Sequence, residues 1–296
     1  MEEEIRKEFM ELLRLLDEGK LQEFKDKATE CPPVDIAEGL EEIEDEGRVL
    51  RVFRMLPKDI SSDVFSYMTS EQQQLIAESA TNAELKALVD DMFMDDTVDF
   101  LEEMPANVVK KVLQNADEGT RKTINQFLNY PENSVGSIMT AEFTDIKGDM
   151  TVGDAIRYLR SVSDNKETIY TCYIISPSRE LEGVVELCDI LACKDDNTLI
   201  ADIMETGVVK AVTTEDREAG LFSKYDLATL PVVDNENRLV GIVTVDDIVD
   251  VIEEEATKDI EQMAAMEPLE TPYLKTGVFT IVRKRIVWLL ILMVAG

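Results

Sequence analysis

The sequence predicts an α+β chain of several parts: an all-α superhelical N-terminal region, two successive β-α-β-β-α units, and a long connecting helix. Three observations predict it. Apolar residues recur at helical spacing from the N-terminus to about residue 130. After the break at Asn129–Ser134, short apolar runs alternate with helical segments, and this order occurs twice. The stretch Gly241–Asp259 then begins as an apolar strand and continues as a helix crowded with acidic residues.

In the first part, short amphipathic segments repeat a similar pattern. Leu12, Leu13 and Leu16 would share one face of an early helix. Segments 36–43 and 98–105 resemble each other, with acidic residues between apolar ones. Short helices that repeat in this way predict a right-angle stack or a small superhelix of helical hairpins.

The second part contains one unit in two copies, at 134–199 and 200–256. Each copy has a leading apolar segment, a helix, two strands joined by a turn, and a further helix. Two small sheets of this size cannot bury both faces alone, so we expect them to pack as one module. The expected elements are helix 152–160, strands 170–175 and 181–187 and a helix from 189, then helix 218–225, strands 229–233 and 239–245 and a helix from 246.

The charge of the chain restricts its partners. It has 62 acidic and 30 basic residues, a formal net charge of −32, and no histidine. This balance excludes nucleic acid, whose phosphates require Lys and Arg, and disfavours anionic membrane surfaces. Cations or basic partners are favoured, with solubility or halophilic adaptation as the alternative. The absence of histidine excludes Ser-His-Asp and Cys-His catalysis and the usual zinc sites. Without a P-loop or a nucleophile elbow either, we expect no enzyme.

Two acidic clusters stand out. Asp247, Asp250 and Glu254 lie at i, i+3 and i+7 and so share a helical face. Like charges at this spacing cost roughly 0.2–0.5 kcal/mol per pair, so either a partner offsets the repulsion or the repulsion is useful. A solvated helix face is the alternative. The second cluster is expected along one face of one helix, and it comprises Asp91, Asp95, Asp99 and Glu102.

Cysteines form no CxxC pair, and we expect buried free thiols in a reducing compartment. They are Cys31, Cys172, Cys188 and Cys193.

A basic triplet at 283–285 precedes the apolar run 286–295. This run is about half of the ~20 residues that span a bilayer. We expect 281–296 to be the truncated start of a first transmembrane helix, with everything upstream cytosolic. A C-terminal core helix is the alternative.

The duplicated unit resembles the CBS (Bateman) domain pair, a regulatory module. The matching stretches are 202–204, 230–234 and 241–248, with 137–139 and 183–191 in the first copy. The order of parts resembles the cytosolic region of MgtE-type magnesium channels over essentially the whole chain. That resemblance implies a helical N domain at 1–130, CBS domains at 134–199 and 200–256, a connecting or plug helix at 257–280, and then the membrane segment.

The family resemblance also implies a function. In these channels the cytosolic region senses Mg²⁺, which joins the helical domain, the CBS pair and the plug helix in a compact homodimer and holds the pore shut. The resemblance implies a multi-pass cell-membrane protein whose pore domain is absent here. Lys258 departs from the pattern at a place where an acid is expected. The matching sensor positions are Asp91, Asp95, Asp247, the Gly136 carbonyl, Asp226, Asp250, the Ser223 carbonyl, Glu255 and Asp259, with Asp59 and Asp216 (or Glu215) as weaker matches.

Magnesium chemistry agrees with such sites. Mg²⁺ is hard and octahedral, keeps several waters, and is usually held by one or two carboxylates. The chain has no EF-hand pattern. Moving a two-state equilibrium from 1:99 to 99:1 requires about 5.5 kcal/mol. A site at ten times its Kd contributes about 1.4 kcal/mol, so about four weak sites would act together.

Two other functions stay open. CBS clefts often hold adenosine ligands, and Thr244, Asp247 and Tyr170 stand where ATP could bind in addition to Mg²⁺. The helical region also resembles the flagellar motor protein FliG, which would favour a protein-interaction scaffold. A scaffold would leave the CBS acids and the membrane segment unexplained.

Overall fold

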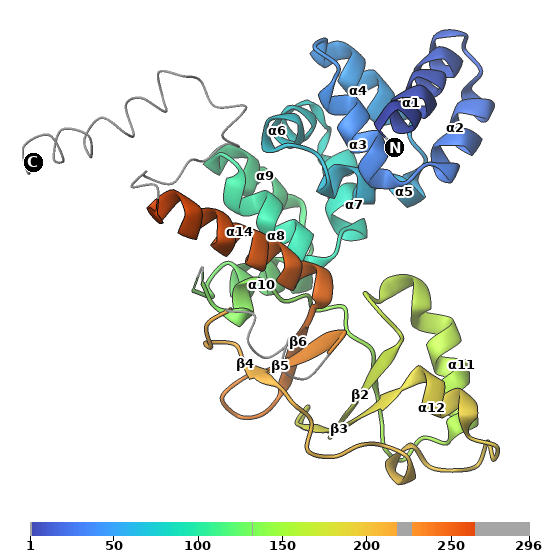
Figure 1. Cartoon of the computed structure of the whole chain (residues 1–296), viewed down its shortest axis with the longest axis vertical. Helices are drawn as coiled ribbons and strands as arrows, with labels where there is room; N and C mark the ends of the chain where they lie inside the picture. The colour runs from blue at the N-terminus through green and yellow to red at the C-terminus, as the bar shows by residue number, and fades with distance from the viewer. Residues whose placement is uncertain (1, 132, 218–226, 264–296) are drawn as a thin grey trace, which may run out of the picture.

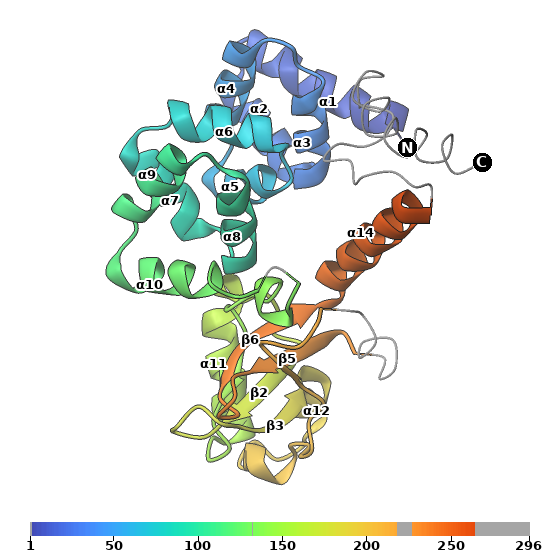
Figure 2. The same ribbon diagram turned by 90° about the vertical axis from the view of Figure 1, so that its left-hand side faces the viewer.

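A computed structural model describes residues 2–131, 133–217 and 227–263. Ten helices form one part of the molecule, and two small sheets with their helices form the other (Figure 1, Figure 2). Helix α14 (Val245–Met263) continues from strand β6 and extends beyond the sheets toward the helical part. This confirms the predicted fold class.

The helical part is a two-layer superhelix. Alternate helices contact each other: α3 packs on α5, α5 on α7, α7 on α9, and α4, α6 and α8 follow the same rule. The predicted superhelix is confirmed, although only α1 and α2 pack strongly as neighbours in a hairpin. Buried Leu12, Leu13 and Leu16 cover the inner face of α1, as their spacing predicts. The helices are α1 (Glu2–Asp17), α2 (Leu21–Glu30), α3 (Pro33–Glu41), α4 (Glu46–Met55), α5 (Lys58–Ser66), α6 (Ser70–Ser79), α7 (Asn82–Asp91), α8 (Met94–Glu103), α9 (Ala106–Asn115) and α10 (Glu118–Phe127).

One expectation about this part is wrong. The second acidic cluster does not run along one helix, because α7 ends at Asp91 and α8 begins at Met94. Met92 and Phe93 take extended conformations between the two helices. The side chains of Met92 and Met94 are buried on either side of this break. The chain therefore breaks the helix where it buries these two methionines, although the acids keep helical spacing across the break.

The second part contains the same small sheet twice. In each, the first strand is parallel to the second and the second is antiparallel to the third. Thr171 pairs with Glu186 in one sheet as Thr229 pairs with Thr244 in the other. The predicted duplication is therefore present in the strand register. The elements are β1 (Asp145–Ile146), α11 (Val152–Val162), β2 (Thr171–Ile175), β3 (Leu181–Glu186) and α12 (Leu187–Ala192), then β4 (Ala211–Val212), β5 (Thr229–Val233), β6 (Leu239–Thr244) and α14.

The two sheets pack as one module, and each half lends a segment to the other. Thr140, from the first half, bridges Ile242 of β6, while Glu205, from the second, bridges Val184 of β3. The Tyr173 hydroxyl lies 2.8 Å from the Thr229 hydroxyl across the module. A shared apolar cluster fills the space between the sheets. The halves therefore stabilise each other.

The segment between the helical part and the first sheet pairs with the second half. The amides of Val135 and Gly136 donate to the carbonyls of Glu215 and Thr213 at 2.8 and 3.0 Å. A Cβ at Gly136 would lie 2.8 Å from the Thr213 oxygen, so only glycine allows this approach. The apolar core of the helical part continues through this segment into the second sheet. These contacts place α8 opposite α14.

The cysteine prediction is partly wrong. Cys31 and Cys172 are buried, but Cys193 is half-buried and Cys188 is exposed. Cys188 lies on α12, a helix of six residues whose only buried residue is Ile190. A helix this short covers its sheet with Ile190 and the half-buried Leu187, and it leaves its outer face in solvent.

Several expectations fall on residues that are not described. These are the helix at 218–225, most of the connecting helix at 257–280, and the apolar segment 281–296. Within the described ranges, α14 runs without a break to Met263, so the last CBS helix and the start of the connecting segment are continuous. Of the helices described, none has both the length and the apolar character to cross a bilayer.

Candidate cation site between helices α8 and α14

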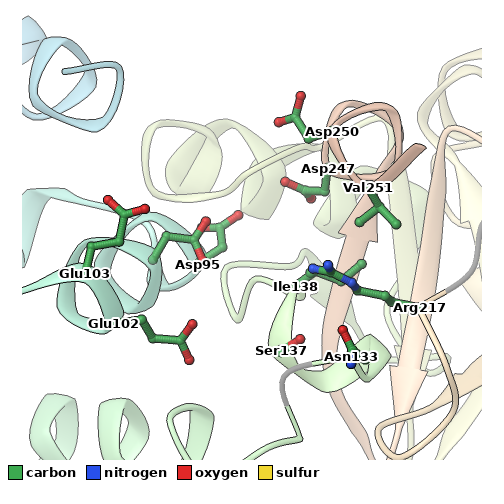
Figure 3. A pocket seen from close by; sticks show the side chains of 11 residues that line it. Asp95, Glu102, Glu103, Asn133, Ser137, Ile138, Arg217, Asp247, Asp250 and Val251 are labelled. Carbon is green, nitrogen blue, oxygen red and sulfur yellow. The ribbon is translucent and has the colours of Figure 1, made fainter. Parts of the chain in front are cut away.

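A cavity of about 570 Å³ lies between the helical part and the second CBS-like half (Figure 3). Helix α8 lines one side and α14 the other, with the segment around Asn133–Ile138 beneath them. Arg217 is the only basic side chain among its described lining residues, and it lies 3.9 Å from Glu255. The cavity is therefore strongly anionic and suits a cation. Its carboxylates are Asp95, Asp99, Glu102 and Glu103 from α8 and Asp247 and Asp250 from α14.

Asp95 is the most constrained of these carboxylates. It lies in the first turn of α8, and its Oδ1 atom is buried without a hydrogen-bond partner. Burial raises the pKa of Asp95 well above its usual range, and the nearby carboxylates of Asp96 and Asp247 raise it further. A buried carboxylate oxygen without a partner is costly, because it loses water and gains nothing in return. A proton or a metal ion would remove that cost.

Asp247 faces Asp95 from α14 (Figure 3). Its Oδ2 atom accepts hydrogen bonds from the Thr244 amide at 3.1 Å and the Thr244 hydroxyl at 2.6 Å. Thr244 directly precedes the helix, so Asp247 caps its own helix N-terminus. Burial raises the pKa of Asp247 to about 6, against the lowering effect of the Thr244 hydrogen bonds. The two hydrogen bonds from Thr244 hold the Oδ2 atom of Asp247 in place.

A second group of acids, Glu167, Asp96 and Asp246, adjoins the first, and none of the three is a predicted ligand. Burial raises the pKa of Glu167 to about 7, and the carboxylates of Asp246 and Asp247 raise it further. Burial also raises the pKa of Asp96, whose carboxylate accepts a hydrogen bond from Ser66 at 3.0 Å. Asp96 and Asp246 belong to visible acidic runs, whereas Glu167 stands apart from them in sequence. No local pattern marks it, because only the fold brings it close.

The remaining predicted ligands are more dispersed. Asp91 is exposed at the end of α7 and lines a different cavity, of about 390 Å³. Asp59 and Asp216 are exposed, and Asp216 bridges Ser134. Gly136 is buried beside Thr213.

Other predicted ligands lie wholly or partly outside the described residues. Asp226 and Ser223 are not described, and only the backbone of Asp259 is, within α14. The structure thus brings Asp95, Asp247 and Asp250 to one cavity and leaves the other predicted ligands elsewhere or undescribed. Within the described ranges, no three His, Cys, Asp or Glu side chains are grouped closely enough to hold an ion directly.

Of the predicted nucleotide ligands, Thr244 and Asp247 contact each other and Tyr170 stands apart. Thr244 is buried and its hydroxyl donates to Asp247. Tyr170 is 73% exposed just before β2, where its ring is accessible for stacking. In the part of the chain that is described, no hydrogen bond joins Tyr170 to the other two.

The carboxylates of this cavity are suitable ligands for a hard cation such as Mg²⁺. Its carboxylates come from two elements and stand too far apart to form a closed cage, and Mg²⁺ commonly bridges such groups through retained water. A zinc site would require histidine or thiolate ligands, and the chain has no histidine. The geometry therefore supports a hydrated hard cation that links the two helices.

Comparisons with known proteins agree with this architecture. Residues 31–133 match the family model of the MgtE intracellular N domain, and residues 200–254 match the CBS domain. The chain is 33% identical over 291 residues to the magnesium transporter MgtE of Thermus thermophilus, covering 96% of this chain and 64% of the relative. It is 31% identical to MgtE of Bacillus subtilis, covering 97% and 63%. The chain thus spans slightly under two thirds of these transporters, which are not enzymes.

Two solved structures are similar over nearly their whole length. The soluble part of a magnesium transporter matches with a TM-score of 0.80 and 29% identity, over 85% of this chain and 99% of that one. The cytosolic domain of the Mg²⁺ channel MgtE in complex with ATP matches with a TM-score of 0.75 and 32% identity, over 82% and 99%. The chain belongs to the MgtE family of magnesium transporters and corresponds to the cytosolic region of its members.

Proposed function

We propose that this region senses Mg²⁺ for a magnesium transporter or channel, and that Mg²⁺ bridges α8 and α14 to favour the closed, compact state. One observation carries the proposal: the buried Oδ1 atom of Asp95 has no partner in a cavity that it shares with Asp247 and four other carboxylates. A divalent cation would satisfy this oxygen and neutralise the charge around it. Loss of Mg²⁺ would restore the repulsion and favour the open pore.

The repulsion acts only at short range, which suits this location. At physiological ionic strength charges are screened over about 8 Å, so acids must lie at the moving interface to act on it. The four acids on α8 and the two on α14 meet this condition because they line the same cavity. Separation of the helical part from α14 would let each carboxylate be hydrated. The interface itself would thus be the switch.

Further cations would act at the other predicted positions. We include Asp226, Asp250 and the Ser223 carbonyl within the second CBS domain, and Glu255 and Asp259 at the base of the plug helix. Asp91, the Gly136 carbonyl, Asp59 and Asp216 remain weaker candidates. Several weak sites together would give the steep response that one site cannot.

The same proposal includes a homodimer. Val245, Val249 and Ile252 are each about half exposed, at 49%, 47% and 49%, and their spacing places them on one face of α14. An apolar stripe of this kind suits a second copy of the chain through the CBS pair and the plug helix. The rest of the relatives' length would supply the pore, in the cell membrane.

A Mg²⁺ titration of the 296-residue chain tests the proposal. We expect small-angle scattering to show a smaller radius of gyration as Mg²⁺ rises, with a sigmoidal dependence, and calorimetry to count several bound ions. The scattering must be repeated at several protein concentrations, so that dimerisation is separated from compaction. A single non-cooperative site without compaction would contradict it.

Nucleotide binding is a second function, in addition to Mg²⁺ sensing. The similar structure described in complex with ATP favours it, together with the exposed ring of Tyr170 and the Thr244–Asp247 pair. Because Asp247 would serve both ligands, their affinities would be coupled reciprocally. Calorimetry with ATP, with and without Mg²⁺, checks this, and equal ATP affinity in both conditions would exclude the coupling.

A further inference from the structure

Helix α9 is the last odd-numbered helix of the superhelix, and one of its sides has no helix packed on it. Helices α3, α5, α7 and α9 pack on one another in series. Among the described elements, α9 packs closely on α7 and α6 and on no later helix. Figure 2 shows α9 at the edge of the helical part, on the side away from α14. The series thus stops at α9, where a further helix could continue it.

A groove of about 550 Å³ runs along this side of α9. Its lining residues on α9 recur at i, i+3, i+4, i+7 and i+8, the spacing of a helix face that packs on another helix. At 100° per residue, this face lies opposite the side that α9 buries in the core of the superhelix. We call it the α9 groove, and on α9 it is lined by Ala106, Val109, Lys110, Leu113 and Gln114.

The charged residues that line the α9 groove are all basic, in a chain whose net charge is −32. They are Lys110 and Arg121, the latter from α10, and both are exposed. Within the described ranges, neither side chain makes an ion pair. The cavity of about 390 Å³ beside Asp91 has two basic and two acidic lining residues instead. The acidic cavity between α8 and α14 shares no lining residue with the α9 groove, so the two surfaces are separate.

The apolar residues of the α9 groove are only partly covered. Val109 and Leu113 are half-buried, and they pack against the edge of the main core. A partner that covers them and also pairs with Lys110 and Arg121 must present apolar and acidic groups on one surface. An amphipathic helix does so, with apolar residues at i, i+3, i+4 and i+7 and acidic residues beside them. An anionic membrane fits less well, because the net charge of the chain opposes its approach.

We propose that the α9 groove binds an acidic amphipathic helix of another protein, which takes the place of the next helix in the series. Apolar side chains of that helix cover Val109 and Leu113, and its carboxylates pair with Lys110 and Arg121. The apolar contacts supply most of the affinity, and the exposed charges select an acidic partner. Helix α9 has ten residues, so the contact is about 15 Å long. The interaction is separate from the proposed sensing function and requires no Mg²⁺.

Selection from a library of displayed helical peptides tests the proposal in EDTA, with the 296-residue chain as the target. Apolar positions of the peptides are fixed at helical spacing, and the flanking positions are randomised. We expect the selected peptides to carry more Asp and Glu than Lys and Arg at the flanking positions.

The dissociation constant of a selected peptide is then measured by fluorescence anisotropy. Reversing both charges in Lys110→Glu/Arg121→Glu should raise it about tenfold, because two exposed ion pairs become two repulsive pairs. Leu113→Ala, which removes apolar surface without changing charge, should raise it about fivefold. Thermal unfolding followed by circular dichroism checks that each variant remains folded.

The matched control is Lys25→Glu/Arg51→Glu, which reverses an exposed lysine on α2 and an exposed arginine on α4. It makes the same change in net charge and should leave the dissociation constant unaltered. Equal weakening by both double variants would overturn the proposal, as would a selection that yields no acidic peptide or none that depends on the α9 groove. Sedimentation velocity distinguishes the other occupant: if the chain self-associates and Lys110→Glu/Arg121→Glu abolishes this, a second copy fills the groove and the proposed partner is wrong.

Discussion

The two halves of the CBS module share a fold and differ in what their last helix meets. Their strands have the same order, directions and register, and both hairpins carry a register shift at the same place. The last helix of the first half, α12, has six residues, and that of the second half, α14, has 19. Helix α14 shares the acidic cavity with α8, whereas the outer face of α12 is exposed.

Equivalent positions therefore have different surroundings. Strand register aligns Glu186 with Thr244, and three residues later Asp189 aligns with Asp247. Asp189 is exposed, while Asp247 is held by Thr244 and lies in the cavity opposite Asp95. The fold thus supplies an acid at this position twice, and the neighbouring helix decides which copy lines a cavity.

The first prediction, with the greatest change in stability, concerns a glycine that both halves have at the same strand position. Gly183 and Gly241 are equivalent, and an added Cβ would lie 2.8 and 2.7 Å from the carbonyl oxygens of Glu205 and Thr140. We expect Gly183→Ala and Gly241→Ala each to lower the free energy of unfolding by about 2 kcal/mol, measured by urea denaturation. Gly148→Ala is the control, since its Cβ would make only ordinary van der Waals contacts, with Ala201 at 3.4 Å and Ile174 at 3.6 Å. A large difference between the two variants in the loss of unfolding free energy would show that the two positions are not equivalent.

A smaller effect tests where the halves differ. We expect Asp247→Asn to raise the Mg²⁺ concentration for half-maximal compaction about tenfold, or ~1.4 kcal/mol, because a carboxylate facing Asp95 is lost. Asp189→Asn makes the same change at the equivalent exposed position and should leave the midpoint unaltered. Scattering-monitored Mg²⁺ titrations of both variants provide the measurement. Equal shifts would show that net charge, rather than the cavity, controls the response.

The smallest effect concerns pH in metal-free buffer. The pKa of Asp247 in the folded protein is about 6, above the ordinary value of about 3.9, so the folded state binds more protons than the unfolded state between these values. The cost of ionising Asp247 is present above pH 6 and is relieved as pH falls toward 4, so unfolding free energy rises in that direction.

Asp247→Asn should remove about 1 kcal/mol of this pH dependence between pH 8 and pH 5, after allowance for partial exposure. Urea denaturation at several pH values measures it. Asp189→Asn serves again as the control, because it corrects for the pH dependence of the highly charged chain as a whole. If both variants keep the same pH profile as the unmutated protein, Asp247 does not titrate in this range.

Much of the architecture follows from local sequence. The helical spacing in α1, the duplicated strand pattern and the acidic start of α14 each predict their elements correctly. The break between α7 and α8 could not be predicted in this way, because the acidic spacing continues through Met92 and Phe93. It is set by the burial of Met92 and Met94 in a core whose other members come from distant parts of the chain. Asp91 therefore stands apart from Asp95.

Residue type and spacing are enough to identify the acidic clusters, the duplicated module and the absence of histidine-based chemistry. Which of the acids lie close together depends on the packing of elements that are far apart in the chain. The fold brings Asp95 and Asp247 to one cavity, leaves Asp91 on another, and adds Glu167 from the first half. The physical reason is that charges interact over a few ångströms, and the docking of the linking segment against Glu215 and Thr213 sets those distances.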